Sequence, residues 1–152
     1  VNPVADAKVR SSTPTRNFGT LTDLQVRLEN AATPHTFRSY VQFAVTGLSG
    51  PPRSAKLRLY VTDPSSQGGI AYAVPSTWTE TGLTWNNAPP LDGSPLATLG
   101  SVTANTWKEI DVTSAITGNG SYSFGIKEGT TSDSAFYSSR EGANPPQLII
   151  TP

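Results

Sequence analysis

The sequence predicts an all-β protein: a β-sandwich of the jelly-roll type, with about eight or nine antiparallel strands in a single domain over residues 1–152. Three observations predict this class. Apolar and polar residues alternate in short runs, which is the period of a strand with one buried face. Clusters of turn-forming residues separate these runs. Only 36% of the residues are hydrophobic, so the core must be thin, as it is between two packed sheets.

The alternating runs predict nine strands, at 4–10, 23–29, 38–45, 55–62, 70–75, 106–112, 121–127, 134–140 and 146–151. Glycine, proline and asparagine mark turns at 49–52, 63–64, 68–69 and 118–120. Residues 76–105 form a longer, irregular segment. A short helical turn is expected at 113–117, where Asp111 or Thr113 could cap it.

The composition favours an exported module. The chain has no cysteine, which excludes disulfides and thiol chemistry, and only 14% of its residues are charged. No apolar run is long enough to cross a bilayer, and the first residues do not form a signal peptide. We therefore expect a secreted or cell-surface protein whose leader was removed or belongs to a larger parent.

Charge is distributed unevenly along the chain, although its net value is zero. Residues 1–60 hold eight of the eleven basic residues and three acidic ones, and the remainder holds the opposite excess. The position of the charges, and not their total, must therefore indicate the partner.

Alternation in four strands of the first 60 residues predicts a basic outer face. Apolar side chains at alternate positions are expected to face the core, which leaves the intervening positions exposed. The predicted outward residues are Lys8, Arg10, Arg27, Tyr40, Lys56, Arg58 and Tyr60, accompanied by one acid, Asp6. A solvated face usually mixes the two signs of charge, so this set predicts a ligand-binding surface. The alternative is an ordinary solvated face, and the strand order needed to join the four strands is left open.

Three oxygen-bearing residues, Asp6, Asn17 and Glu141, lie in segments that could converge on a hard cation such as Ca²⁺. No calcium-loop spacing accompanies them. The alternative is that Asn17 caps a turn and that Arg140 pairs with an acid.

The three tryptophans are interpreted as structural. Trp78 and Trp85 lie in a segment rich in proline and asparagine that could fold over one end of the sandwich and bury both rings. Trp107 is predicted to be a core residue. The alternative for the first two is stacking on a sugar ring.

The sequence gives little support for catalysis or for nucleic-acid binding. The single histidine, His35, would have to serve any triad or His-based zinc site alone. Pairs of carboxylates that could hydrolyse glycosides, such as Glu80 with Asp111 or Glu141, can be chosen in many ways. The acidic second half of the chain argues against a nucleic-acid partner.

Seven segments together resemble a known family. They lie at 5–10, 17–19, 39–43, 55–61, 78–89, 107–113 and 138–142, and the most specific is WTETGLTWNNAP at 78–89. This series resembles the DNRLRE-type domains, which are grouped with the family-96 carbohydrate-binding modules, over residues 4–151. The resemblance implies a β-jelly-roll appended to secreted bacterial or archaeal enzymes and surface proteins.

The resemblance also implies a ligand, namely alginate or a similar uronic-acid polymer held by basic side chains, and it permits a structural calcium ion. We therefore predict a non-catalytic, monomeric module that binds an acidic polysaccharide and contacts neither membrane nor nucleic acid. The alternative is a structural spacer or adhesion domain of a larger surface protein, with no glycan ligand.

Overall fold

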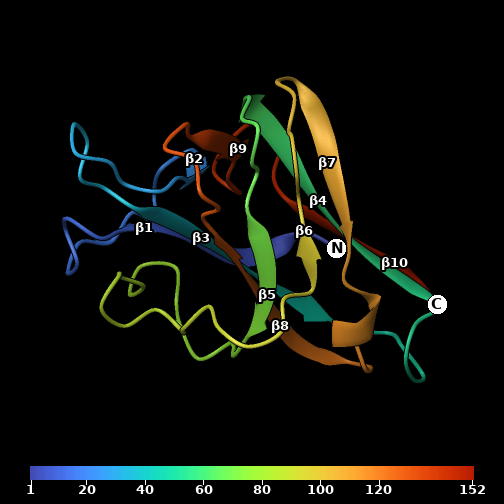
Figure 1. The fold of residues 1–152 in the computed structure, drawn as a ribbon. Helices are drawn as coiled ribbons and strands as arrows, with labels where there is room; N and C mark the ends of the chain where they lie inside the picture. Colours follow the sequence, from blue (N-terminus) through green and yellow to red (C-terminus); the bar gives the residue numbers. More distant parts are fainter.

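The computed structural model describes residues 1–152 as a sandwich of two antiparallel sheets (Figure 1). The first sheet has the order β1-β3-β8-β5-β6, and the second has the order β10-β4-β9-β2, with β7 paired to β4. The strands are β1 (Pro3–Arg10), β2 (Asp23–Val26), β3 (Phe37–Val45), β4 (Ser54–Asp63), β5 (Ile70–Val74), β6 (Ala97–Thr98), β7 (Thr106–Asp111), β8 (Gly120–Lys127), β9 (Ala135–Ser138) and β10 (Gln147–Thr151). From β1 to β5, and again from β6 to β9, successive strands alternate between the two sheets, as in a jelly roll.

The predicted all-β sandwich is confirmed, and each of the nine predicted strands is present with small differences at its ends. The strand expected at 23–29 ends at Val26 because only an isolated bridge, Arg27 to Phe37, continues the pairing. Strand β6 was not predicted, since its two residues lie inside the irregular segment. The expected helical turn is the 3-10 helix η1 (Thr113–Ala115), and Asp111 Oδ1 accepts a hydrogen bond from the Thr113 N–H at 2.9 Å. No helix in the structure has the length and apolar character needed to span a membrane.

The main core lies between the two sheets. Its largest side chains include Phe43 and Phe124 from the first sheet, whose rings pack 6.4 Å apart, and Tyr137 from the second. Leu57, Leu59 and Val61 point into this core from β4, as their alternation predicts. The intervening β4 residues therefore point away from the core.

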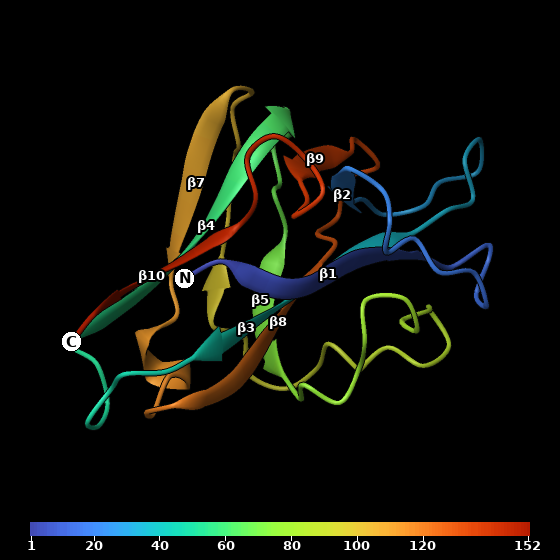
Figure 2. The same ribbon diagram turned by 180° about the vertical axis from the view of Figure 1, so that it is seen from behind.

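The edges of the two sheets meet at the start of the chain (Figure 2). The amino group of Val1 donates a hydrogen bond to the Leu148 carbonyl at 2.8 Å, and the Leu148 N–H donates to the Val1 carbonyl at 3.0 Å. These bonds join the beginning of β1 to β10, so the first sheet closes against the second on this side.

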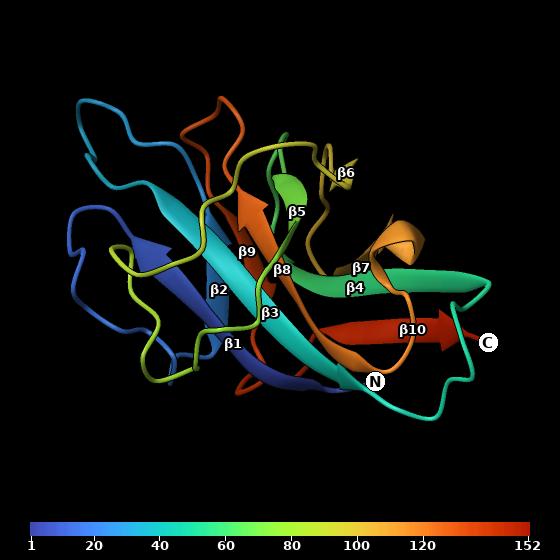
Figure 3. The same cartoon turned by 90° about the horizontal axis from the view of Figure 1, so that it is seen from below.

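A second apolar cluster lies on the outer face of the first sheet, beneath the segment between β5 and β6, which we name the covering segment (residues 75–96). Figure 3 shows this segment crossing β1 and β3. The cluster consists of Ala5, Ala7, Val9, Tyr40, Tyr72, Trp78, Leu83 and Leu91. The Tyr40 hydroxyl donates a hydrogen bond to the Pro89 carbonyl at 2.7 Å. The outer face of this sheet is therefore filled by the chain itself.

Candidate functional site

The seven predicted ligand residues do not form one face. They divide into a group at the end of β1 and β2 (Lys8, Arg10 and Arg27), a group on the outer face of β4 (Lys56, Arg58 and Tyr60), and the isolated Tyr40. β1 and β3 belong to one sheet, and β2 and β4 belong to the other. The structure thus offers two surfaces where the alternation suggested one.

The expectation that Tyr40 and Lys8 face outward is wrong. Tyr40 is 2% exposed because the covering segment packs on it, and burial raises its pKa to about 12. Lys8 is 7% exposed, and its Nζ lies 2.7 Å from Asp23 Oδ2 and 3.2 Å from Gln25 Oε1. On β1 the apolar residues face the covering segment, so the polar ones point the opposite way. Lys8 reaches β2, and Asp6, which was also predicted to face outward, is 1% exposed beside Arg140 in the turn after β9.

The surface on β4 and β7, which we name the β4–β7 face, has its cations already paired. Register places Lys56 opposite Asp111, Arg58 opposite Glu109, and Tyr60 opposite Trp107. Lys56 Nζ lies 3.4 Å from Asp111 Oδ2. Arg58 Nε lies 2.9 Å from Glu109 Oε2 but is not aligned as a hydrogen bond, so the contact is an ion pair. The charges of these four residues cancel.

Trp107 was predicted to be a core residue, and this prediction is wrong. Its strand places it in phase with Glu109 and Asp111, so it lies on the outer face at intermediate burial. Its ring packs edge-on against Tyr60 with centroids 5.2 Å apart, and the Arg58 guanidinium lies 4.5 Å from the ring centroid. The alternation of β7 contained the signal that would have placed it correctly.

The end formed by the loops at 11–22 and 27–36 is basic. In Figure 1 these loops project side by side from the same end of the sandwich as the end of β1 and the start of β3. They are joined by a hydrogen bond from the Ser11 N–H to the Thr36 carbonyl at 3.0 Å and by a 2.5 Å contact between His35 Nδ1 and Ser12 Oγ. We name the set Arg10, Arg16 and Arg27 the basic end.

Two phenylalanines lie among the cations of this end, Phe18 through its ring and Phe37 through its backbone pairing. The guanidinium carbons of Arg10 and Arg16 lie 5.5 and 4.8 Å from the Phe18 ring centroid. Phe37 pairs with Arg10 on one side and with Arg27 on the other. Arg16 was missed at the sequence level because it lies in a loop, where alternation assigns no face.

The guanidinium groups of the basic end form no salt bridge. Arg10 Nε donates a hydrogen bond to Thr13 Oγ1 at 3.0 Å, and Arg27 donates to Thr33 Oγ1. Hydroxyl partners orient these side chains without neutralising them. Their positive charge is therefore available to an anion.

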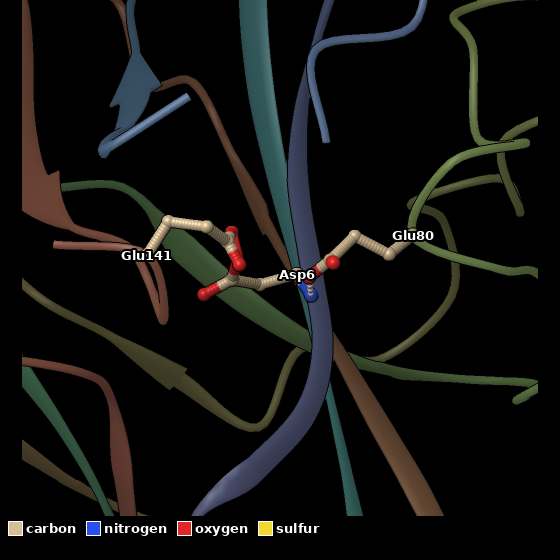
Figure 4. Close-up of side chains that lie close together, drawn as sticks. All are labelled: Asp6, Glu80 and Glu141. Atoms are coloured by element: carbon tan, nitrogen blue, oxygen red, sulfur yellow. Dashed lines mark hydrogen bonds between the residues drawn. The ribbon is translucent and has the colours of Figure 1, made fainter. Parts of the chain in front are cut away.

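A cluster of acids lies elsewhere, around Asp6. Carboxylate oxygens of Asp6, Glu80 and Glu141 lie within 4.8 Å of one another (Figure 4). Burial is the main cause that raises the pKa of Asp6 to about 8, and the neighbouring Glu141 and Glu80 raise it further. Burial also raises the pKa of Glu141.

The predicted convergence of Asp6 and Glu141 agrees with this geometry, but Asn17 takes a different role. Its Oδ1 accepts a hydrogen bond from the Gly19 N–H at 2.9 Å, as in the alternative of turn capping. Its amide donates to the carbonyls of Glu80 and Leu83 at 2.7 and 2.8 Å. The third carboxylate, Glu80, comes from the covering segment, and no spacing in the sequence placed it beside Asp6.

The covering segment packs on the outer face of the first sheet, where it buries Trp78 as predicted and leaves Trp85 half-buried. Trp78 is buried in the second apolar cluster, and its ring packs edge-on against Tyr40. Trp85 is half-buried against the same cluster, with the guanidinium of Arg38 4.7 Å from its ring centroid. Arg38 is itself held by Glu128 through two hydrogen bonds of 2.8 and 2.9 Å.

Two small hollows, each of about 230 Å³, carry no charged side chain. One is lined by Gln67, Gly69, Ile70, Thr98, Gly100, Gly129 and Thr130, and the other by Thr77, Trp78, Thr79, Gly82 and Asn87. Neither provides a counter-charge for an anion, so an acidic ligand requires one of the exposed surfaces.

A jelly-roll sandwich with exposed cationic and aromatic side chains and no enclosed reactive centre is typical of a carbohydrate-binding module. The chain belongs to carbohydrate-binding module family 96, whose family model matches residues 1–152, the whole chain. Modules of this class are generally non-catalytic and typically extracellular. No curated protein matches the chain.

Proposed function

We propose that this module binds an acidic, uronic-acid polysaccharide such as alginate, and that the basic end holds it. The observation that carries the proposal is that Arg10, Arg16 and Arg27 gather at one end without a single carboxylate partner. A uronate polymer carries one carboxylate on each sugar. A row of unpaired guanidinium groups suits such a chain because each group binds a carboxylate through two parallel hydrogen bonds.

The aromatic residues between the cations support the same ligand. The Phe18 ring lies against the guanidinium groups of Arg10 and Arg16 and helps to hold them in place, which lowers the entropy lost when a ligand binds. Arg16 is exposed, so it makes the most accessible contact.

The β4–β7 face is the weaker candidate for an acidic ligand. A carboxylate that binds Arg58 or Lys56 must displace Glu109 or Asp111 and meet their repulsion. Tyr60 and Trp107 offer an apolar edge that suits the C–H faces of a sugar of either charge. Lys56, Arg58 and Tyr60 therefore remain predicted contacts of the polysaccharide, and affinity electrophoresis also tests them.

Affinity electrophoresis through gels that contain alginate, polygalacturonate or a neutral β-glucan tests the proposal. We expect retardation in the two uronate gels only, and less retardation as NaCl rises, because exposed charges are screened. Arg16→Ala and Arg10→Gln should each weaken uronate binding several-fold. Arg53→Ala is the matched control, since Arg53 is an exposed arginine outside both surfaces that forms no salt bridge.

Three outcomes decide between the surfaces and functions. Loss of binding in Arg58→Ala with none in Arg16→Ala would move the site to the β4–β7 face. No retardation of the wild-type protein in any gel would favour a spacer or adhesion domain. Release of new reducing ends from alginate would contradict the proposed non-catalytic role, in which the secreted, monomeric module concentrates a parent enzyme or cell surface on its polysaccharide.

A further inference from the structure

The carboxyl group of Asp6 is the most unusual polar group in the molecule. Asp6 is 1% exposed, although its strand ends in a polar loop. Its Oδ2 accepts a hydrogen bond from the Arg140 N–H at 2.8 Å. Its Oδ1 is buried and has no hydrogen-bond partner. A buried carboxylate oxygen without a donor is costly, so it needs compensation by a cation or by a proton on the carboxyl group.

The carboxyl group of Asp6 lies in a group of three acids. Figure 4 shows the Asp6 carboxyl group against that of Glu141, with Glu80 on the other side of β1. The side chains of Glu80 and Glu141 are 20% and 25% exposed, so the group opens to solvent on their side. An ion therefore has a route to the buried oxygen.

The spacing of the oxygens fits calcium. Calcium–oxygen distances of about 2.3–2.6 Å let two ligands of one ion lie up to roughly 5 Å apart. The three carboxylates offer oxygens that all lie within 4.8 Å of one another. Calcium is preferred to magnesium because it accepts several carboxylates in a flexible geometry, whereas magnesium gives up its water ligands reluctantly and demands a near-ideal octahedron.

Arg140 neutralises part of the group. Its Nη1 lies 3.0 Å from Glu80 Oε2 and 3.7 Å from Glu141 Oε2. One guanidinium against three carboxylates leaves a charge of about −2 when all three are ionised, which a divalent cation balances. The raised pKa of Asp6 has the same origin, because without a cation its negative charge is buried beside two others.

We propose that Asp6 Oδ1, Glu80 and Glu141 bind one Ca²⁺ ion, with solvent completing its oxygen shell. Asp6 belongs to β1, Glu80 to the covering segment, and Glu141 to the turn after β9. The ion would therefore fasten the covering segment and this turn to the edge of the first sheet. The ion pair of Arg140 with an acid, which is the alternative expected from the sequence, is also present. Glu80 and Glu141 would contact both Arg140 and the ion, whereas Asp6 Oδ1 accepts no hydrogen bond from Arg140.

Calcium binding is measured on the whole chain in the absence of polysaccharide, because uronate polymers bind calcium themselves. After EDTA treatment and removal of the chelator, isothermal titration with CaCl₂ should show one site. The thermal unfolding midpoint should rise with CaCl₂ in a saturable manner and respond more weakly to MgCl₂. Asp6→Asn and Glu141→Gln should each lower the calcium affinity at least about tenfold.

Asp92→Asn is the matched control, because Asp92 is an exposed acid outside the group. Its calcium affinity should equal that of the wild type. No calcium binding by the wild type at millimolar CaCl₂, or equal affinity in Asp6→Asn and wild type, would overturn the proposal. Asp6→Asn is expected to fold because the buried position favours an uncharged group, and Glu141→Gln gives a second test at a more exposed position. The result is independent of the polysaccharide, which is tested in gels that contain EDTA.

Discussion

A substitution of Tyr40 distinguishes a structural role of this residue from a role in ligand binding, because a structural role predicts a loss of stability and a binding role predicts a loss of affinity. Alternation placed Tyr40 among the ligand residues, whereas the structure buries it beneath the covering segment. Tyr40→Phe removes only the hydroxyl group and keeps the ring. We expect lower stability and unchanged affinity for uronate polymers.

The expected loss of stability in Tyr40→Phe follows from one hydrogen bond. The Tyr40 hydroxyl donates to the Pro89 carbonyl at 2.7 Å, and both residues are buried. In Tyr40→Phe that carbonyl loses its donor and has no access to water, which costs about 1–3 kcal/mol. For a domain of this size, 1 kcal/mol lowers the unfolding midpoint by roughly 2–4 °C.

The same burial predicts an alkaline dependence. The pKa of Tyr40 is raised from 10.0 to about 12, so the folded state holds this proton more tightly than the unfolded state does. The resulting stability is complete below pH 10 and is lost as the pH rises toward 12. In that window it falls by about 1.4 kcal/mol per pH unit. Burial also raises the pKa of Tyr137, which steepens the wild-type slope in the same direction.

Urea unfolding of wild type and Tyr40→Phe at pH 7, 10 and 11.5 measures both effects. The variant should be less stable at pH 7 and should lose stability less steeply above pH 10, since the raised pKa of Tyr40 no longer contributes. Affinity electrophoresis in alginate gels should give identical mobility shifts. Equal stability at pH 7, equal slopes above pH 10, or weaker alginate binding in a fully folded variant would refute the assignment.

Three further substitutions test the packing. Leu148→Ala, at a fully buried position of β10, should lower the free energy of unfolding by about 2–5 kcal/mol in urea, and a loss below 1 kcal/mol would contradict its place in the core. Glu128→Gln should cost about 2 kcal/mol, with little change in 0.5 M NaCl, because the bidentate pair with Arg38 is largely buried; strong salt dependence would indicate an exposed pair. Gly19→Ala would bring a methyl group to 2.1 Å from the Glu80 carbonyl oxygen, so it should cost about 1–3 kcal/mol by calorimetry, and a neutral result would contradict this close approach.

The fold could be predicted because strand alternation is a local signal. On β4, Leu57 and Leu59 face the core and Arg58 faces outward, as the pattern requires. The turn residues placed the strand ends to within a few residues. Strand β6 escaped because two residues are too few to show a period.

The candidate site could be predicted only in part, because alternation tells which residues share a face and not which face is exposed. On β1, Ala7 and Val9 do share a face, but that face lies beneath the covering segment. Lys8 consequently points toward β2, into its ion pair with Asp23. The covering segment has no regular alternation, and the strands beneath it keep their usual alternation. Their sequences therefore do not show that this face is covered.

The acidic group around Asp6 shows the same limit at longer range. Asp6 and Glu80 are 74 residues apart, and their contact depends on the path of the covering segment. Trp107 differs, since its phase with Glu109 could have been read from β7 alone. The contact between Asp6 and Glu80 could be known only from the tertiary structure. The outward position of Trp107 could have been predicted from the alternation of β7.

The two cationic groups show why a count of charges is a poor guide to a binding surface. Lys56 and Arg58 lie on a strand whose neighbour β7 presents an acid at each opposing position, so the sheet neutralises them across its own register. Arg10 and Arg27 flank Phe37, which carries no charge. Arg16 extends from a loop that has no facing strand. The register of the sheet thus neutralises the cations of β4, whereas Arg10, Arg16 and Arg27 keep their charge at the end of the sandwich where the loops meet solvent.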